Sequence, residues 1–307
     1  MTHTALTDLG GLIASDAVVE KVVSSPEFTL TEGPVWHPNG RLYFSEIPGS
    51  KKFSWNEAEG LRCVETPTNR ANGQAVDAAG NLIVCEHETS VIARIQLDAD
   101  GFPRAREVLV SHDQGIELNS PNDVIVASDG TIYFTDPTYG RRQDWVGRVR
   151  ELERDFRGVY ALRRDGELRC LIREFTQPNG LCLSPDESML YVNDSEEFVI
   201  RAFPLTPDGS VGEGTVLFSG LGDQDDRPRG FCDGMKCDAQ GNIWVTGPDG
   251  IWVVSPDGAH LGTVVVPEQA HNLTWGDADW RGLYITNSSA IYRIRTLVGG
   301  AHRPASL

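Results

Sequence analysis

The sequence is poor in positive charge and has no long apolar run. Its 307 residues carry 27 Lys and Arg against 44 Asp and Glu, which gives a formal net charge of −17. Binding to nucleic acid needs a basic face, so this balance argues against a nucleic-acid partner. A membrane-spanning helix needs about 18 or more consecutive apolar residues, and no such run occurs. A generally acidic surface explains most of the charge, which would also help to attract a cation.

The six cysteines are not arranged in CxxC pairs, which argues against a zinc ribbon. They are Cys63, Cys85, Cys170, Cys182, Cys232 and Cys237. The second, fourth, fifth and sixth lie in or beside apolar runs, so we expect buried free thiols in a reducing compartment. The N-terminal segment lacks the basic and apolar regions of a signal peptide. We therefore expect a cytoplasmic protein. A periplasmic or exported protein is the alternative if a leader has been removed.

Glycine and proline are frequent, with 32 and 17 residues, and they mark turns between repeated strand patterns. Six similar segments recur: "RLYFSEI", "NLIVCEH", "TIYFTDP", "MLYVNDS", "NIWVTGP" and "GLYITNS". Their first apolar residues are Leu42, Leu82, Ile132, Leu190, Ile243 and Leu283, which are 40 to 58 residues apart. Each segment follows a turn rich in Gly, Asp, Asn or Pro. The pattern predicts six β-hairpins.

Each predicted hairpin is followed by a third β-like run, and in five of the six repeats by a fourth. The sixth repeat ends without a fourth run, and the unused run Ala17–Val23 can supply it. Four-stranded units of about 40 to 50 residues, repeated six times, predict an all-β chain folded as a six-bladed β-propeller. The N-terminal strand is expected to close the last blade. We expect residues 1–16 to be an N-terminal extension and residues 17–307 to form one domain.

A polar residue stands ten or eleven positions before each of the six apolar residues, at the start of each predicted first strand. These ring positions are Glu32, Asn72, Asn122, Asn179, Asp233 and Asn272. First strands line the channel of a propeller, so the six side chains should converge on its axis. Carboxylate and amide oxygens suit Ca²⁺ or Mg²⁺. The alternative is that Asn-Gly and Asp-Gly are ordinary turn dipeptides. Six occurrences in phase, each followed by a separate turn, favour the ring.

We expect four ring residues to bind the cation directly: Glu32, Asn122, Asn179 and Asp233. Asn72 and Asn272 would either support these ligands through hydrogen bonds or face the substrate. Second strands return to the same face, which makes Glu86 and His87 candidates for substrate contact, with solvated rim residues as the alternative. The long connection 137–157 is either a lid, which brings Tyr139 and Arg141 to the ligand, or a charged surface excursion. His271 is a base, a neighbour of a second ion or a hydrogen-bonded core residue.

Several segments resemble the gluconolactonase/regucalcin (senescence marker protein) family, which includes luciferin-regenerating enzyme. They include "TEGPVWHPNGRLYFSEI", "LNSPNDVIVASDGTIYFTDPTYG", "PNGLCLSPDESMLYVND" and "CDGMKCDAQGNIWVTGP". The likeness is strongest to the bacterial gluconolactonases. It implies a six-bladed propeller with one divalent cation, whose ligands match the Glu, Asn, Asn and Asp at ring positions 32, 122, 179 and 233. It also implies a role in proton transfer for Asp233.

Two positions depart from the family pattern. Ser120 stands where regucalcin-type members carry an arginine, so it is a candidate substrate contact with a changed preference. His271 stands where gluconolactonases often have a small residue, and a histidine nearby is similar to diisopropyl fluorophosphatase, a related propeller. Both positions bear on which substrate is bound.

The expected function is metal-dependent hydrolysis of sugar (aldono-) lactones such as gluconolactone. The cation would polarise the carbonyl, and Asp233 would assist the attack of water. Ca²⁺ is the expected ion, with Mg²⁺, Mn²⁺ or Zn²⁺ as alternatives. No GxSxG nucleophile motif occurs. A phosphotriesterase-like hydrolase using the same site and a non-catalytic propeller scaffold are the other readings. The expected partner is a small lactone, without nucleic acid or membrane, and the oligomeric state is left open.

Overall fold

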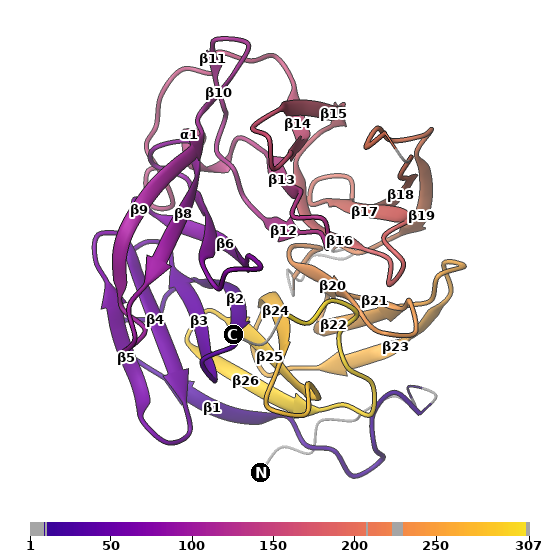
Figure 1. The fold of residues 1–307 in the computed structure, drawn as a ribbon. Helices are drawn as coiled ribbons and strands as arrows, with labels where there is room; N and C mark the ends of the chain where they lie inside the picture. Colours follow the sequence, from indigo (N-terminus) through magenta and orange to yellow (C-terminus); the bar gives the residue numbers. More distant parts are fainter. Residues whose placement is uncertain (1–8, 10, 207, 223–229, 305–307) are drawn as a thin grey trace. The chain divides into compact units, whose positions relative to one another are not determined.

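The computed structural model describes residues 9, 11–206, 208–222 and 230–304. Over these residues the chain contains 26 strands and one four-residue helix. It divides into two compact units, residues 32–179 with 304–307 and residues 1–31 with 180–303. Each unit holds three four-stranded antiparallel sheets (Figure 1). The six sheets are the blades of a six-bladed β-propeller, as the repeats predict.

The first unit, residues 32–179, contains blades one to three, and their strands follow one another in chain order. Blade one is β2 (Thr31–His37), β3 (Arg41–Glu46), β4 (Lys51–Asn56) and β5 (Gly60–Glu65). Blade two is β6 (Ala71–Val76), β7 (Leu82–Glu86), β8 (Val91–Leu97) and β9 (Pro103–Val110). Blade three is β12 (Val124–Val126), β13 (Ile132–Asp136), β14 (Arg157–Leu162) and β15 (Leu168–Phe175).

The second unit, residues 180–303 with 1–31, contains blades four to six. Blade four is β16 (Pro178–Leu183), β17 (Met189–Asp194), β18 (Val199–Pro204) and β19 (Thr215–Ser219). Blade five is β20 (Met235–Cys237), β21 (Ile243–Gly247), β22 (Gly250–Val254) and β23 (His260–Val265). Blade six is β24 (Ala270–Gly276), β25 (Gly282–Asn287), β26 (Ala290–Arg295) and β1 (Glu20–Ser24).

The N-terminal strand closes the last blade, as predicted. β1 pairs antiparallel with β26, so it is the fourth strand that the sixth repeat lacks. The segment before it also packs on this unit. Leu9, Leu12 and Ile13 are buried, and Ile13 forms a β-bridge with Thr296.

The second strands of five blades, β3, β7, β13, β21 and β25, are buried at every residue. Each lies between two strands of its own sheet. Burying one Val, Leu, Ile or Phe side chain contributes about 1.5–3 kcal/mol. Four of the six free cysteines are buried in this core, as expected, and the described residues form no disulfide.

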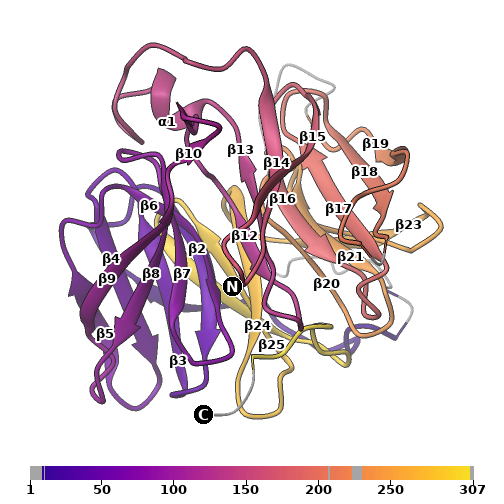
Figure 2. The same cartoon turned by 45° about the horizontal axis from the view of Figure 1, so that its top comes forward.

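Two elements of the first unit were not predicted. The connection between β13 and β14, here called the insertion (residues 137–156), contains the short helix α1 (Tyr139–Arg142). The β10–β11 hairpin (His112–Asp113 and Ile116–Glu117) precedes blade three. Both views show α1 beside this hairpin at one end of the unit (Figure 2). Over the described residues, no helix has the length and apolar character needed to cross a membrane.

Candidate functional site

The six ring positions all occur at the start of a first strand. Glu32, Asn72, Asn179 and Asn272 lie within β2, β6, β16 and β24, whereas Asn122 precedes β12 by two residues. Asp233 precedes β20 by two residues in the same way. The other five ring residues are buried, whereas the side chain of Asp233 keeps 15% of its surface exposed. The positions belong to both units, and each group is described within its own unit.

In the first unit the backbone brings neighbouring ring positions close together. The backbone N–H of Gly33 donates to Glu32 Oε2 over 2.6 Å. The N–H of Gly73 donates to the carbonyl oxygen of Asn122 over 2.9 Å, which joins the starts of β6 and β12. Three consecutive blades of this unit therefore present Glu32, Asn72 and Asn122 at equivalent places on adjoining strands.

In the second unit Asp233 and His271 lie side by side. His271 Nδ1 is 3.8 Å from Asp233 Oδ2, and its Nε2 lies 3.2 Å from Ser288 Oγ. The carbonyl of His271 accepts the N–H of Gly234 over 2.8 Å, and the carbonyl of Asp233 accepts the N–H of Gly180 over 3.0 Å. The separation of the two side chains is longer than a hydrogen bond, but a carboxylate and an imidazole this close can both contact one bound water.

The glycines that follow the ring residues are explained by close packing of first strands rather than by turns. A Cβ at Gly33 would lie 2.1 Å from the carbonyl oxygen of Asn72, and one at Gly73 would lie 2.6 Å from that of Asn122. A Cβ at Gly180 would lie 2.2 Å from the carbonyl oxygen of Asp233. Larger residues cannot be accommodated at these distances without moving backbone. The turn-dipeptide alternative therefore does not account for these positions.

A second set of polar residues recurs at the same position of the second strands and forms hydrogen bonds with the backbone of ring residues. It was not predicted from the sequence. The set stands three residues after the first apolar residue of five second strands, at Ser45, Thr135, Asn193, Thr246 and Thr286, whereas the equivalent position in blade two is the apolar Cys85. Ser45 Oγ donates to the carbonyl of Asn72 over 2.8 Å, and Thr135 Oγ1 to that of Asn179 over 2.8 Å. Asn193 Nδ2 donates to the carbonyl of Asp233 over 2.7 Å. The repeated Ser, Thr and Asn was the signal that could have revealed it.

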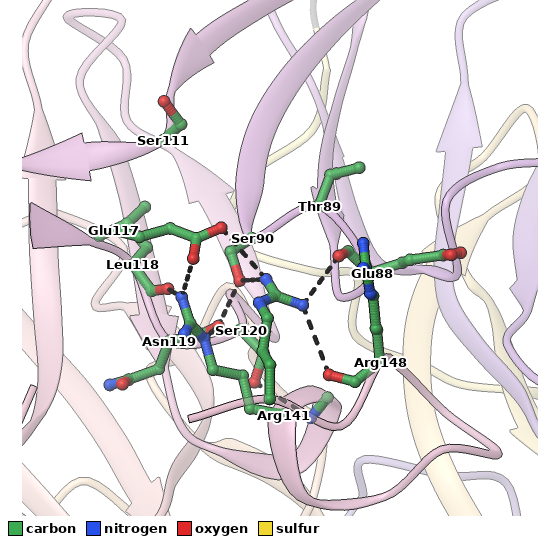
Figure 3. Close-up of polar contacts among 12 residues, drawn as sticks. Glu88, Thr89, Ser90, Ser111, Glu117, Leu118, Asn119, Ser120, Arg141 and Arg148 are labelled. Atoms are coloured by element: carbon green, nitrogen blue, oxygen red, sulfur yellow. Dashed lines mark hydrogen bonds and ion pairs between the residues drawn. The ribbon is translucent and has the colours of Figure 1, made fainter. Parts of the chain in front are cut away.

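The side chains of three residues predicted to contact substrate form hydrogen bonds with other groups of the protein. The carboxylate of Glu86 accepts two bonds of 2.7 Å from Arg106, and Ser120 Oγ donates to the carbonyl of Pro137 over 2.8 Å. The guanidinium of Arg141 donates to the carbonyls of Leu118 and Asn119 and to the carboxylate of Glu117. Figure 3 shows these bonds around Arg141. These groups hold the loops of the first unit in place.

Two further predicted residues lie against the insertion. Tyr139 begins α1 and is partly exposed. His87 is buried directly after β7, where its ring contacts the side chain of Asn72 and the backbone of the insertion. Burial lowers the pKa of His87 to about 4, so the imidazole is neutral at ordinary pH.

The donor chemistry of the ring fits a hard divalent cation. Glu32, Asn122, Asn179 and Asp233 offer two carboxylates and two carboxamides, and oxygen donors of this kind bind Ca²⁺ or Mg²⁺. Within the described residues, no group of three or more His, Cys, Asp and Glu side chains is arranged to hold a metal. The predicted set contains only two such side chains, so amide oxygens would have to complete it.

Comparison with known proteins decides the family. Residues 30–289 match the SMP-30/Gluconolactonase/LRE-like region. The chain belongs to this family. The gluconolactonase of Zymomonas mobilis is 30% identical over 95% of this chain and 85% of its own length. A solved gluconolactonase from Xanthomonas campestris is 33% identical, with a TM-score of 0.84 over 95% of this chain and 94% of that chain. Another X-ray structure, 32% identical, gives a TM-score of 0.88 over 97% and 99% of the two chains. Members of the SMP-30/gluconolactonase family thus match both units.

Proposed function

We propose that this chain is a divalent-cation-dependent hydrolase that opens sugar (aldono-) lactones such as gluconolactone. The observation that carries the proposal is the in-phase series of Glu32, Asn72, Asn122, Asn179, Asp233 and Asn272 at the starts of six consecutive blades. Membership of a family whose relatives include named gluconolactonases supports the substrate class. The free cysteines fit a reducing compartment, and we propose the cytoplasm.

The proposed cation ligands are Glu32, Asn122, Asn179 and Asp233, with Ca²⁺ as the expected ion. When bound, a divalent ion polarises the lactone carbonyl and lowers the pKa of a coordinated water. Two carboxylates balance its charge, and two amide oxygens add ligands without adding charge. Asn72 and Asn272 orient the hydroxyl groups of the sugar ring, because an amide both donates and accepts hydrogen bonds.

Asp233 is the proposed general base. Its backbone is fixed on both sides, since its N–H donates to Thr246 Oγ1 over 2.7 Å and its carbonyl accepts from Asn193 Nδ2 over 2.7 Å. The partly exposed carboxylate can therefore reach water from a rigid position. It accepts the proton of the attacking water, and nearby His271 stabilises the charge of the carboxylate or relays the proton.

The test compares Asp233→Asn with Asp238→Asn on gluconolactone. Asp233→Asn keeps the size and one oxygen but removes the charge and the base, so kcat should fall about 10²- to 10⁴-fold. Asp238 is buried in the connection between β20 and β21 of blade five, where it accepts from Trp244 Nε1 over 2.9 Å. Asp238→Asn should therefore lower stability while kcat stays near the wild-type value. Full activity of Asp233→Asn would overturn the mechanism.

The same assays separate the alternatives. If the protein hydrolysed an organophosphate triester faster than gluconolactone, the phosphotriesterase hypothesis would be favoured, in which the cation polarises a phosphoryl oxygen. The absence of both activities together with no Ca²⁺ binding by calorimetry would favour a non-catalytic scaffold. The proposed function requires lactone turnover and cation binding together.

A further inference from the structure

His87 bridges a ring residue and the insertion within the first unit. Its Nε2 lies 3.1 Å from Asn72 Nδ2, and its Nδ1 lies 3.0 Å from the carbonyl oxygen of Val146. All three residues are buried. The imidazole thus has one hydrogen-bond partner on each side, one from the ring and one from the loop that follows α1.

The chemistry of these partners fixes where the hydrogens are. A backbone carbonyl only accepts, so Nδ1 of His87 must carry the hydrogen that it donates to Val146. In the neutral ring Nε2 then has no hydrogen and must accept from Asn72. The amide of Asn72 is obliged to turn its NH₂ group toward His87 and its oxygen away from it.

Close packing keeps the insertion against His87. A Cβ at Gly140 would lie 2.7 Å from the Cβ of His87 and 2.9 Å from that of Ser120, so α1 is in direct contact with both. Arg150 Nη1 donates to the carbonyl of Glu88 over 2.9 Å, which ties the end of the insertion to the residue after His87. The distance from His87 to Val146 is therefore set by several contacts.

We propose that His87 is a positioning residue: through its bond to Val146 it holds the Asn72 amide with its oxygen directed to a hydroxyl group of the sugar lactone. The part that concerns substrate rests on the proposed function. His87 then acts through Asn72 rather than by touching substrate itself. Its bond to the insertion makes the orientation of Asn72 depend on the insertion being in place.

The first experiment reads the imidazole hydrogens directly and needs no activity. Two-bond ¹H–¹⁵N correlation spectra of ¹⁵N-labelled protein at neutral pH distinguish the two neutral tautomers, and His87→Gln assigns the signal. The expected result is the Nδ1–H form for His87. His37 is a matched control, because its Nε2 lies 2.8 Å from the carbonyl of Gly80 and its Nδ1 accepts from Asn39 N–H, which requires the opposite tautomer. An Nε2–H form or a cation at His87 would overturn the proposal.

The second experiment is a double-mutant cycle on gluconolactone. His87→Phe keeps the ring volume and removes both nitrogens, so KM should rise about 5- to 10-fold while kcat changes less than about twofold, as for loss of one neutral hydrogen bond. In an Asn72→Ala background the same change should have no further effect on KM. Independent effects of the two substitutions, or an unchanged KM in His87→Phe, would overturn the proposal.

Two controls keep the outcomes separable. His37→Phe should lower the melting temperature and leave KM unchanged, since His37 lies at the other end of β2 from Glu32. His87→Gln retains a donor and an acceptor, so its KM should stay close to the wild-type value. This variant also provides a test if His87→Phe folds poorly. A wild-type protein without lactone turnover would refute the proposed function, whereas the tautomer of His87 would still decide the orientation of Asn72.

Discussion

Asp233 differs from the other five ring residues because its carboxylate is partly exposed while its backbone is rigidly held. Its N–H and its carbonyl are each fixed by a side chain of the adjoining second strands, Thr246 and Asn193. A general base needs this combination of accessible oxygen and fixed position. The remaining ring residues are buried, which suits groups that hold an ion or orient a substrate.

Asp136, at the end of β13, is buried, and one carboxyl oxygen accepts the N–H of Asn119 over 2.8 Å. Its other oxygen has no hydrogen-bond partner among the described residues. Burial raises its pKa to about 7 from an ordinary value of 3.8. The folded state therefore retains a proton that the unfolded chain loses above pH 4, so this group lowers the free energy of unfolding as pH rises from about 4 to 7.

Asp136→Asn should remove that pH dependence. The variant keeps an acceptor for Asn119 but cannot ionise, so its free energy of unfolding should exceed that of wild type by about 4 kcal/mol at pH 8 and by only about 1.5 kcal/mol at pH 5. Urea unfolding at both pH values measures this difference. Asp186→Asn is the control, because the pKa of Asp186 is lowered to about 2 by Ser184 and Ser188, and it does not titrate in this range. Parallel pH profiles for Asp136→Asn and wild type would contradict the prediction.

At the scale of elements, the insertion is held by buried arginines. Arg141 on α1 is buried and donates to three carbonyls and to Glu117. Figure 3 shows its place among these residues. Its neighbour Arg142 is exposed. The planar guanidinium makes bonds in several directions at once, which a lysine ammonium cannot reproduce. The two adjacent arginines therefore form a matched pair for testing what holds the insertion.

Arg141→Lys should lower the free energy of unfolding by about 2–3 kcal/mol, because buried acceptors lose their donors. Arg142→Lys should change it by less than about 0.5 kcal/mol. Limited proteolysis should also cut the insertion faster in Arg141→Lys alone. Equal stability and equal cleavage of the two variants would show that Arg141 does not hold the insertion.

The strand elements were largely predictable, and the elements between them were not. Leu42, Leu82 and their four equivalents mark second strands because each begins a similar apolar segment that follows a turn in every repeat. The long connection 137–157 was identified from its length, but α1 within it and the β10–β11 hairpin have no counterpart in the other repeats, so no periodic signal marks them. The ring positions were found from their nearly constant distance to the second-strand residues. The hydrogen bonds of Glu86 and Arg141 join residues about 20 or more positions apart, which sequence spacing does not reveal.

At the scale of the whole molecule, the six blades are stabilised without disulfides. Cys63 is exposed, Cys170 is half-buried and the other four cysteines are buried. Burial also raises the pKa of Cys85 and of Cys232, which makes these thiols poor nucleophiles. The fold is thus stabilised by its hydrophobic core and by the β1–β26 pairing, whereas a small secreted domain would rely on disulfide bonds.

Thiol titration should report this burial. At pH 8, an aromatic disulfide reagent should react rapidly with Cys63, slowly with Cys170, and with the remaining thiols only after guanidinium unfolding. Cys63→Ser should remove the fast phase and leave the others. Rapid reaction of four or more thiols in the native protein would show that the blades are not packed as described.

The central claim is that a bound divalent cation supports lactone hydrolysis by this propeller. The most direct measurement is the pH-stat rate of gluconolactone hydrolysis, corrected for the spontaneous reaction, by chelator-treated protein before and after one equivalent of Ca²⁺. The stripped protein should show almost no catalysed rate and Ca²⁺ should restore it, while Asp233→Asn stays inactive in both states. Equal rates for the stripped and reloaded wild-type protein would show that hydrolysis does not depend on the cation.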